Sequence, residues 1–240
     1  MSDYFRITRK HSYSLLFVLP LLLLYEVGAW SIAGPTSGMR NGADVLLRAA
    51  LAVGGVHGTA AFAALLVLAG AVLIALERRR ERVPLRPRLF AAMLAESAAY
   101  AVIFGAAVGT VTQWLVGARL AADGGVAQLP VRDQVVLSLG AGLYEELLFR
   151  VLLVGGLAAL FAGVGMRKKN AGIAAALLAA LIFSAFHYIG PYAYPLELQS
   201  FVFRFVAGLA FSGLFLLRGF GIAAWTHALY DVFLVVLRGG

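Results

Sequence analysis

The chain has 240 residues, of which 62% are hydrophobic and only 13% charged, and its mean hydropathy is +0.88. Soluble domains carry about 25% charged and about 45–50% apolar residues, so this composition excludes a soluble enzyme, a DNA-binding domain and a disordered chain. The chain contains no cysteine, which excludes disulfides, thiolate metal sites and a cysteine nucleophile. The net charge of +8 is typical of the basic loops of a membrane protein. No nucleic-acid partner is expected, because the basic residues form no stripe interleaved with aromatic residues.

Long apolar runs predict about seven transmembrane helices, each close to the roughly 20 residues that cross a bilayer. In chain order the predicted spans are 15–34, 54–76, 89–116, 134–162, 171–189, 198–217 and 220–237. The shorter run 41–53 contains Asp44 and Arg48, and we interpret it as an interfacial helix or as part of an eighth crossing. The expected fold is therefore all-α, a polytopic transmembrane bundle of seven or eight helices.

Basic residues gather in the N-terminal segment and in the loops after the second, fourth and sixth spans, notably 78–88 and 167–169. Lysine and arginine accumulate in cytoplasmic loops, so the N-terminus is expected in the cytoplasm. The expected location is a bacterial inner (plasma) membrane. A cleaved signal peptide is the alternative for the first span, but its apolar run is longer than a signal core and further spans follow.

Ionisable side chains inside spans are the most informative residues, because each costs about 2.5–3.5 kcal/mol at a helix centre. They concentrate in the last hundred residues of the chain. The deep set consists of Glu145, Glu146, Arg150, His187, Arg204, His227 and Asp231, and Glu26, His57 and Glu96 lie in the earlier predicted spans.

Two neighbouring carboxylates begin this deep set. Glu146 and Arg150 are four residues apart and share a helix face, as a structural ion pair requires. Glu145 is rotated about 100° away from that face, which leaves it available as a general base. The alternative is that all three side chains form a buried ion-pair network that only fixes helix packing.

Two histidines follow on later spans. His187 ends the fifth span one turn after Phe183, and His227 lies four residues before Asp231 on the last span. An aspartate one turn from a histidine can fix its tautomer. A packing role for His187 and a self-satisfied pair for His227 and Asp231 are the alternatives. Polar groups delivered by three spans nevertheless favour one catalytic centre in a helical bundle.

These residues form a series of short motifs. Glu-Glu-x-x-x-Arg at 145–150, Phe-x-x-x-His at 183–187 and His-x-x-x-Asp at 227–231 resemble the CAAX-protease and bacteriocin-processing (Abi) family of intramembrane proteases. Phe205 to Gly208, with Gly213, resembles the glycine-bearing third motif of that family, and the resemblance covers roughly 135–237. The chain is accordingly divided into motif-free N-terminal helices, 1–130, and a catalytic core, 131–240.

The resemblance implies a glutamic-type intramembrane endopeptidase that acts on a membrane-anchored or lipid-modified peptide or protein. Glu145 would be the general base, His187 would help to activate a water, and His227 with Asp231 would stabilise the oxyanion. Glu146, Arg150 and Phe183 would shape the site. Family members often carry Asn at position 231, and an ionised Asp cannot donate a hydrogen bond, so Asp231 is either protonated or orients His227.

The resemblance leaves the metal dependence of the reaction open. No cofactor is favoured, and zinc held by Glu145, His187 and His227 is the alternative. Two rival functions remain: an ion-coupled transporter that uses the same residues as a relay, and a non-catalytic immunity or scaffold protein on the same fold. The positions along the spans place the site in the outer half of the membrane.

Overall fold

The computed structural model describes residues 3–81, 83–117, 128–190 and 193–239, and this part of the chain contains helices and no strand. The all-α prediction is therefore confirmed. Arg82, in the predicted basic loop, lies outside the described residues. The helices are α1 (Asp3–Thr8), α2 (His11–Ser31), α3 (Gly42–Val53), α4 (Thr59–Arg80), α5 (Pro87–Val116), α6 (Val131–Gly140), α7 (Gly155–Gly163), α8 (Lys168–Phe186), α9 (Leu198–Arg218) and α10 (Phe220–Gly239), with a 3₁₀ turn at Gly34–Thr36.

Among the described residues, seven helical segments are long and apolar enough to cross a membrane: α2, α4, α5, the continuous segment Val131–Gly163, α8, α9 and α10. They correspond one to one with the predicted spans. α3 has 12 residues and is about 18 Å long, which is too short to cross the roughly 30 Å hydrocarbon core alone. One prediction was wrong in detail: His57 is exposed in the connection before α4, outside any span.

The segment between α6 and α7 is π-helical over Ala141–Glu145 and Leu147–Val154. In a π-helix each backbone N–H bonds to the carbonyl five residues earlier, and such turns occur frequently at functional sites. Glu145 and Arg150 therefore lie on widened helical turns, a feature that hydrophobic periodicity does not reveal.

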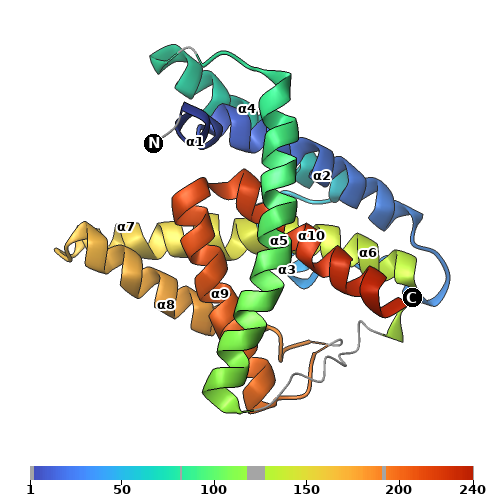
Figure 1. Ribbon diagram of the computed structural model, residues 1–240. Coiled ribbons are helices and arrows are strands. Elements are labelled where there is room, and N and C mark those ends of the chain that lie inside the picture. Colours follow the sequence, from blue (N-terminus) through green and yellow to red (C-terminus); the bar gives the residue numbers. More distant parts are fainter. Residues whose placement is uncertain (1–2, 82, 118–127, 191–192, 240) are drawn as a thin grey trace.

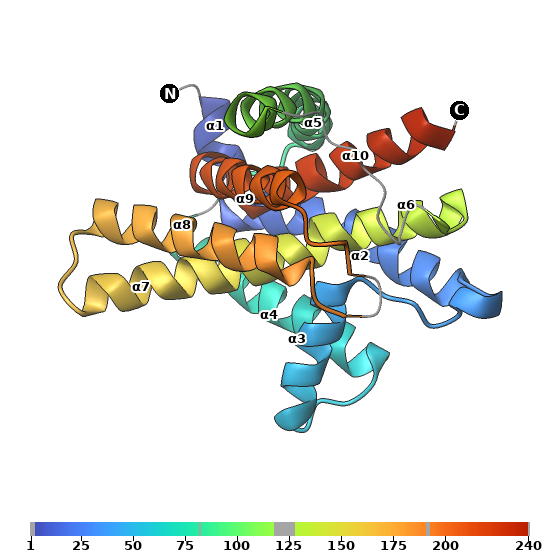
Figure 2. The same cartoon turned by 90° about the horizontal axis from the view of Figure 1, so that it is seen from below.

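α10 lies at the centre of the fold, where it contacts α2, α5, α6, α9 and the first π-helical stretch. α8 and α9 form another extensive contact. In Figure 1 α5 runs across the whole height of the molecule. Figure 2 shows α5 nearly end-on, whereas α6, α7 and α8 lie across the view. Phe183 in the last turn of α8 contacts His227 of α10 with ring centroids 6.5 Å apart, so the C-terminal end of α8 lies close to α10.

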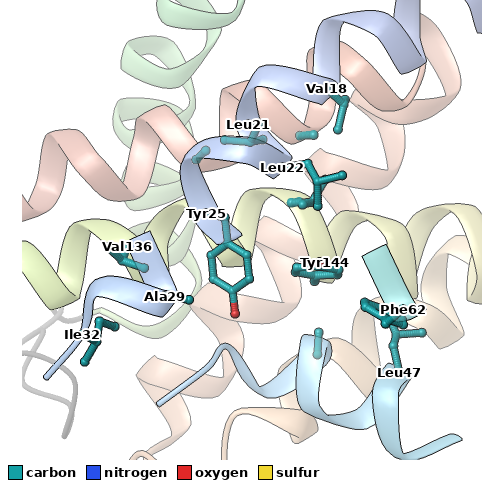
Figure 3. Packing of buried hydrophobic residues seen from close by; sticks show 14 residues of the cluster. Val18, Leu21, Leu22, Tyr25, Ala29, Ile32, Leu47, Phe62, Val136 and Tyr144 are labelled. Carbon is teal, nitrogen blue, oxygen red and sulfur yellow. The ribbon is translucent and has the colours of Figure 1, made fainter. Parts of the chain in front are cut away.

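Aromatic packing joins the N-terminal helices to the π-helical stretch (Figure 3). The rings of Tyr25 and Tyr144 meet edge to face with centroids 5.2 Å apart, and Phe62 packs on Tyr144 at 5.8 Å. Backbone approach is closest at Gly142, where a Cβ would lie 2.5 Å from the carbonyl oxygen of Ala224. This glycine lets α10 pack directly against the helix that carries both glutamates.

Candidate active site

Glu145 and Glu146 are both buried, and they face different partners. Oε1 of Glu145 accepts a hydrogen bond of 2.9 Å from Nδ2 of Asn41, and its Oε2 lies 3.9 Å from Nε2 of His187. Oε1 of Glu146 is 2.8 Å from Nδ1 of His227. Glu145 therefore lies beside His187, whereas Glu146 contacts His227. Side chains from three spans lie close together, as the sequence predicts. Asn41 adds a hydrogen-bond donor to this group.

The ring of His187 is held in one tautomer. His187 caps the C-terminal end of α8, and its Nδ1 lies 2.8 Å from the carbonyl oxygen of Phe183. A carbonyl oxygen only accepts, so Nδ1 carries the proton and donates. In the neutral ring Nε2 then has its lone pair free, and this lone pair is on the side of Glu145. Two hydrogen-bond acceptors therefore face each other at a separation too long for a direct bond.

His227 has a carboxylate at each nitrogen. Besides the contact of Nδ1 with Glu146, Nε2 lies 3.5 Å from Oδ2 of Asp231 one turn along α10. The imidazole stacks on the ring of Phe211 with centroids 4.4 Å apart. The predicted proximity of His227 and Asp231 is confirmed. The role of Glu146 as a partner of His227 was not predicted from the sequence, which assigned it to Arg150 alone.

Arg150 is buried between aromatic rings. Its Nε lies 3.2 Å from Oε2 of Glu146, as their spacing predicts, and its guanidinium carbon lies 4.4 Å from the ring centroid of Phe183 and 5.3 Å from that of Phe211. Glu146 is thus shared between Arg150 and His227. The guanidinium, the two rings and the shared carboxylate hold α9 and α10 against the π-helical segment and shape the site around Glu145.

Asn41 is a site residue that the sequence analysis missed. Its Oδ1 accepts a hydrogen bond from the backbone N–H of Ala43 and so caps α3, which leaves the amide nitrogen to donate to Glu145. An asparagine before a helix is a recognisable capping signal. Nothing in the spacing of residues, however, connects position 41 with position 145.

A network of ion pairs holds the start of α3 in place. Arg40 contacts Glu26 of α2 at 3.0 Å and Asp44 at 2.8 Å, while Arg48 contacts Glu26 at 2.8 Å and also pairs with Asp44. Burial lowers the pKa of Arg40, but hydrogen bonds to Glu26 and Asp44 outweigh this effect and raise the pKa above its ordinary value. Glu26 is therefore a structural residue that pairs with two arginines. Glu96 is also structural, because it pairs with Arg218 at 2.5 Å.

Two tyrosines connect this network to the site. The hydroxyl of Tyr25 donates to Asp44 at 2.8 Å and accepts from the backbone N–H of Asn41 at 3.1 Å. In Figure 3 this hydroxyl points from α2 toward the start of α3. The hydroxyl of Tyr144, the residue before Glu145, donates to Glu26 at 2.8 Å. The position of Asn41 is therefore fixed from α2, from α3 and from the π-helical stretch.

Zinc held by Glu145, His187 and His227 is the alternative to a reaction without a metal, and these side chains as placed do not fit a metal site. In the parts of the chain that the structure describes, no three or more His, Asp or Glu side chains are grouped so that they could hold a metal ion. His227 has a carboxylate beside each nitrogen, Glu146 at Nδ1 and Asp231 at Nε2, so both nitrogens already have a partner other than a metal ion. The chemistry proposed below uses only the side chains themselves.

The comparisons with known proteins agree with the motifs. The family model described as "Type II CAAX prenyl endopeptidase Rce1-like" matches residues 127–233, a range that contains Glu145, His187, His227 and Asp231. A search of curated proteins and a search of solved structures each gave no match. The seven apolar helices of the described residues, together with the matched family, support an integral membrane protein. Residues 127–233 are thus similar to the Rce1-like type II CAAX prenyl endopeptidases.

Proposed function

We propose that this chain is an intramembrane endopeptidase that hydrolyses a peptide bond near the terminus of a membrane-anchored or lipid-modified protein or peptide. One observation carries the proposal: Oε2 of Glu145 and Nε2 of His187 are two acceptors 3.9 Å apart. A water about 2.8 Å from each atom would donate one hydrogen to the carboxylate and the other to the imidazole. The water oxygen is then left with its lone pairs free for attack.

The proposed reaction begins when the water oxygen forms a bond to the scissile carbonyl carbon. Glu145 takes one water proton, and the carbonyl π electrons move to the oxygen to give a tetrahedral oxyanion. On collapse the oxyanion re-forms its double bond and the carbon–nitrogen bond breaks. The proton held by Glu145 passes to the leaving nitrogen. The products are a carboxylic acid, which loses its proton to solvent, and an amine.

His227 is the proposed oxyanion donor. An imidazolium donates from both nitrogens, and a carboxylate beside each nitrogen gives both N–H groups a partner in the resting site. Glu146 holds Nδ1–H, and Nε2–H, which faces Asp231 in the resting site, is the donor that the oxyanion would share with Asp231. In this proposal Asp231 accepts a hydrogen bond from His227 and orients its ring. An Asn at the same position would instead supply a donor.

The side of the membrane to which the site opens follows from the helix directions. Exposure of the side chain rises from 9% at Glu145 to 19% at His187 and 28% at Asp231, so the site opens where α8 ends. α8 begins after the basic segment 167–169, at its opposite end. With basic loops in the cytoplasm, the site opens toward the outer side of a bacterial inner membrane. Substrates would then be exported, membrane-anchored chains.

The test compares membrane proteomes of cells that express the wild-type chain or Glu145→Gln, with Glu197→Gln as a control at an exposed position before α9. The proposal expects at least one protein whose shortened terminus depends on the wild-type chain and on the control but is lost in Glu145→Gln. Loss of ion flux in Glu145→Gln without any change of termini would favour the transporter. Equal termini and an unchanged phenotype would favour the scaffold protein.

A further inference from the structure

Three segments meet at the end of the molecule opposite to the opening of the site. Glu77, near the end of α4, accepts a hydrogen bond of 2.7 Å from the backbone N–H of Ser12 in the first turn of α2. The hydroxyl of Tyr13 donates to the carbonyl oxygen of Pro84 at 2.8 Å and accepts from the backbone N–H of Arg86 at 2.9 Å. The end of α4 and the segment before α5 are thus both fastened to the start of α2, in the upper part of Figure 1.

The carboxylates in this region already have partners, whereas most of the arginines do not. Glu77 is occupied by the start of α2, Glu81 pairs with Lys10, and Glu96 pairs with Arg218. Five exposed arginines, which we call the arginine cluster, have no Asp or Glu side chain within 4.0 Å in the described part of the chain: Arg78, Arg79, Arg80, Arg86 and Arg88. The cluster is therefore a concentration of positive charge that the protein itself does not balance.

The backbone that carries the arginine cluster is anchored next to lipid. Val83, between α4 and α5, is buried in an apolar cluster with Phe17 and Met93, so the connection is fixed on both sides of Pro84. α4 is a peripheral helix, because only 6% of the residues in its apolar window are buried inside the protein. Lipid therefore surrounds most of α4, and the basic end of this helix lies at the level of the lipid headgroups.

We propose that the arginine cluster binds the phosphate headgroup of an anionic phospholipid in the leaflet on the side of the basic loops. Guanidinium groups bind phosphate oxygens in a bidentate geometry, and groups of about four to eight basic residues beside a membrane helix attract anionic lipids. Cations from the end of α4 and from the segment before α5 would contact the same headgroup layer, so the lipid would hold the peripheral α4 against the rest of the bundle. This site is independent of the proposed endopeptidase function.

The test measures the melting temperature of the purified full chain in mixed micelles that contain increasing amounts of phosphatidylglycerol or of phosphatidylcholine with the same acyl chains. Phosphatidylglycerol is expected to raise the melting temperature in a saturable way, and phosphatidylcholine is expected to leave it unchanged. Equal effects of the two lipids would overturn the inference. An equal rise with inorganic phosphate would assign the cluster to a soluble anion, and an equal rise with soluble polyglutamate would assign it to an acidic protein; either result would overturn the lipid site.

A triple variant then locates the site. Replacing the arginines at 78–80 by Gln should raise the half-saturating amount of phosphatidylglycerol about tenfold or more, because each cation near an anionic surface contributes about fivefold. The matched control replaces the three exposed basic residues at 167–169 by Gln, which removes the same charge on the same side of the membrane and should change that amount less than about twofold.

A second variant tests the other half of the cluster. Arg86→Gln combined with Arg88→Gln should also weaken the lipid effect about tenfold or more, and it keeps the inference falsifiable if the triple variant does not fold. Melting temperatures in phosphatidylcholine equal to that of the wild-type chain show that a variant is folded. If the control at 167–169 weakens the lipid effect as strongly as the cluster variants do, the effect reflects the total charge of that side, and the proposed site is overturned.

Discussion

Asn41 donates a hydrogen bond of 2.9 Å to Glu145 across 104 residues of sequence. The bond joins the connection before α3 to the π-helical stretch and fixes one oxygen of the proposed general base. The other oxygen is then directed toward His187. The carboxylate that the sequence analysis took to be without a partner therefore has a specific donor, and its orientation depends on a residue outside the segment that matches the Rce1-like family.

The first prediction separates the two roles of Asn41. Asn41→Ser keeps a side-chain oxygen that can cap α3, but its hydroxyl is too short to reach Glu145. Because hydrogen bonds to charged groups contribute about 1.5–3 kcal/mol, kcat should fall roughly 10- to 100-fold while the melting temperature in detergent changes little. Asn41→Ala should lower both quantities, since it also removes the cap. Full activity of Asn41→Ser would show that the bond does not orient Glu145.

The second prediction concerns His187. His187 holds the attacking water in place, and because misplacement of a reacting group by about 1 Å can cost 10²-fold, His187→Ala should lower kcat by about that factor. His57→Ala is the matched control, because His57 is exposed in the connection before α4. Initial rates of cleavage of a substrate terminus identified by the proteome comparison measure both variants. Comparable rates for the two alanine variants would mean that His187 only packs against its neighbours.

The third prediction concerns the buried pair of Glu146 and Arg150. Arg150→Met removes the buried guanidinium and leaves Glu146 paired with His227, and it should lower the free energy of unfolding by up to about 3–5 kcal/mol. Arg79→Met, at an exposed position near the end of α4, should have little effect. Thermal unfolding in detergent measures both.

A double variant then tests the sharing of Glu146. Adding Glu146→Gln to Arg150→Met should recover part of the stability, because it removes the buried negative charge that the guanidinium balanced. Activity should stay low, since His227 loses the carboxylate at Nδ1. Recovery of activity together with stability would contradict the proposed role of Glu146.

The fourth prediction concerns the close approach of α10. A Cβ at Gly142 would lie 2.5 Å from the carbonyl oxygen of Ala224 and 2.6 Å from Cβ of Ala228, so Gly142→Ala must push α10 outward. Overpacking of this kind costs about 1–3 kcal/mol, and the displacement of His227 should also lower kcat. At Gly156 of α7 a Cβ has no neighbour within 4 Å, so Gly156→Ala should leave stability equal or slightly higher. A melting temperature of Gly142→Ala equal to that of Gly156→Ala would disprove the packing argument.

The sequence predicts well whatever depends on local pattern. Hydropathy locates all seven spans, because about 20 apolar residues in succession are required by the bilayer itself. Four-residue spacing correctly predicts the contacts of Glu146 with Arg150 and of His227 with Asp231, since residues one helical turn apart are neighbours. The proximity of Glu145 and His187 follows from the family motifs.

The remaining features depend on packing between distant segments. Asn41 caps a short helix in the sequence, and only the fold brings its amide to Glu145. The second carboxylate contact of His227 likewise requires α10 to lie against Gly142. The π-helical turns around Glu145 show no signal in the apolar periodicity, because a span that is apolar on most faces has no strong period to disturb. The division of the chain at residue 130 stays a prediction.

The bond between Asn41 and Glu145 has a consequence for the autonomy of the matched region. A fragment limited to 127–233 would contain every motif residue and would still lack the amide donor, together with the α2 and α3 side chains that hold it. Such a fragment would contain the motifs of the protease but no oriented general base, so we expect it to be inactive. If residues 1–117 were supplied as a separate polypeptide in the same membrane, we expect Asn41 to orient Glu145 again and the activity to return.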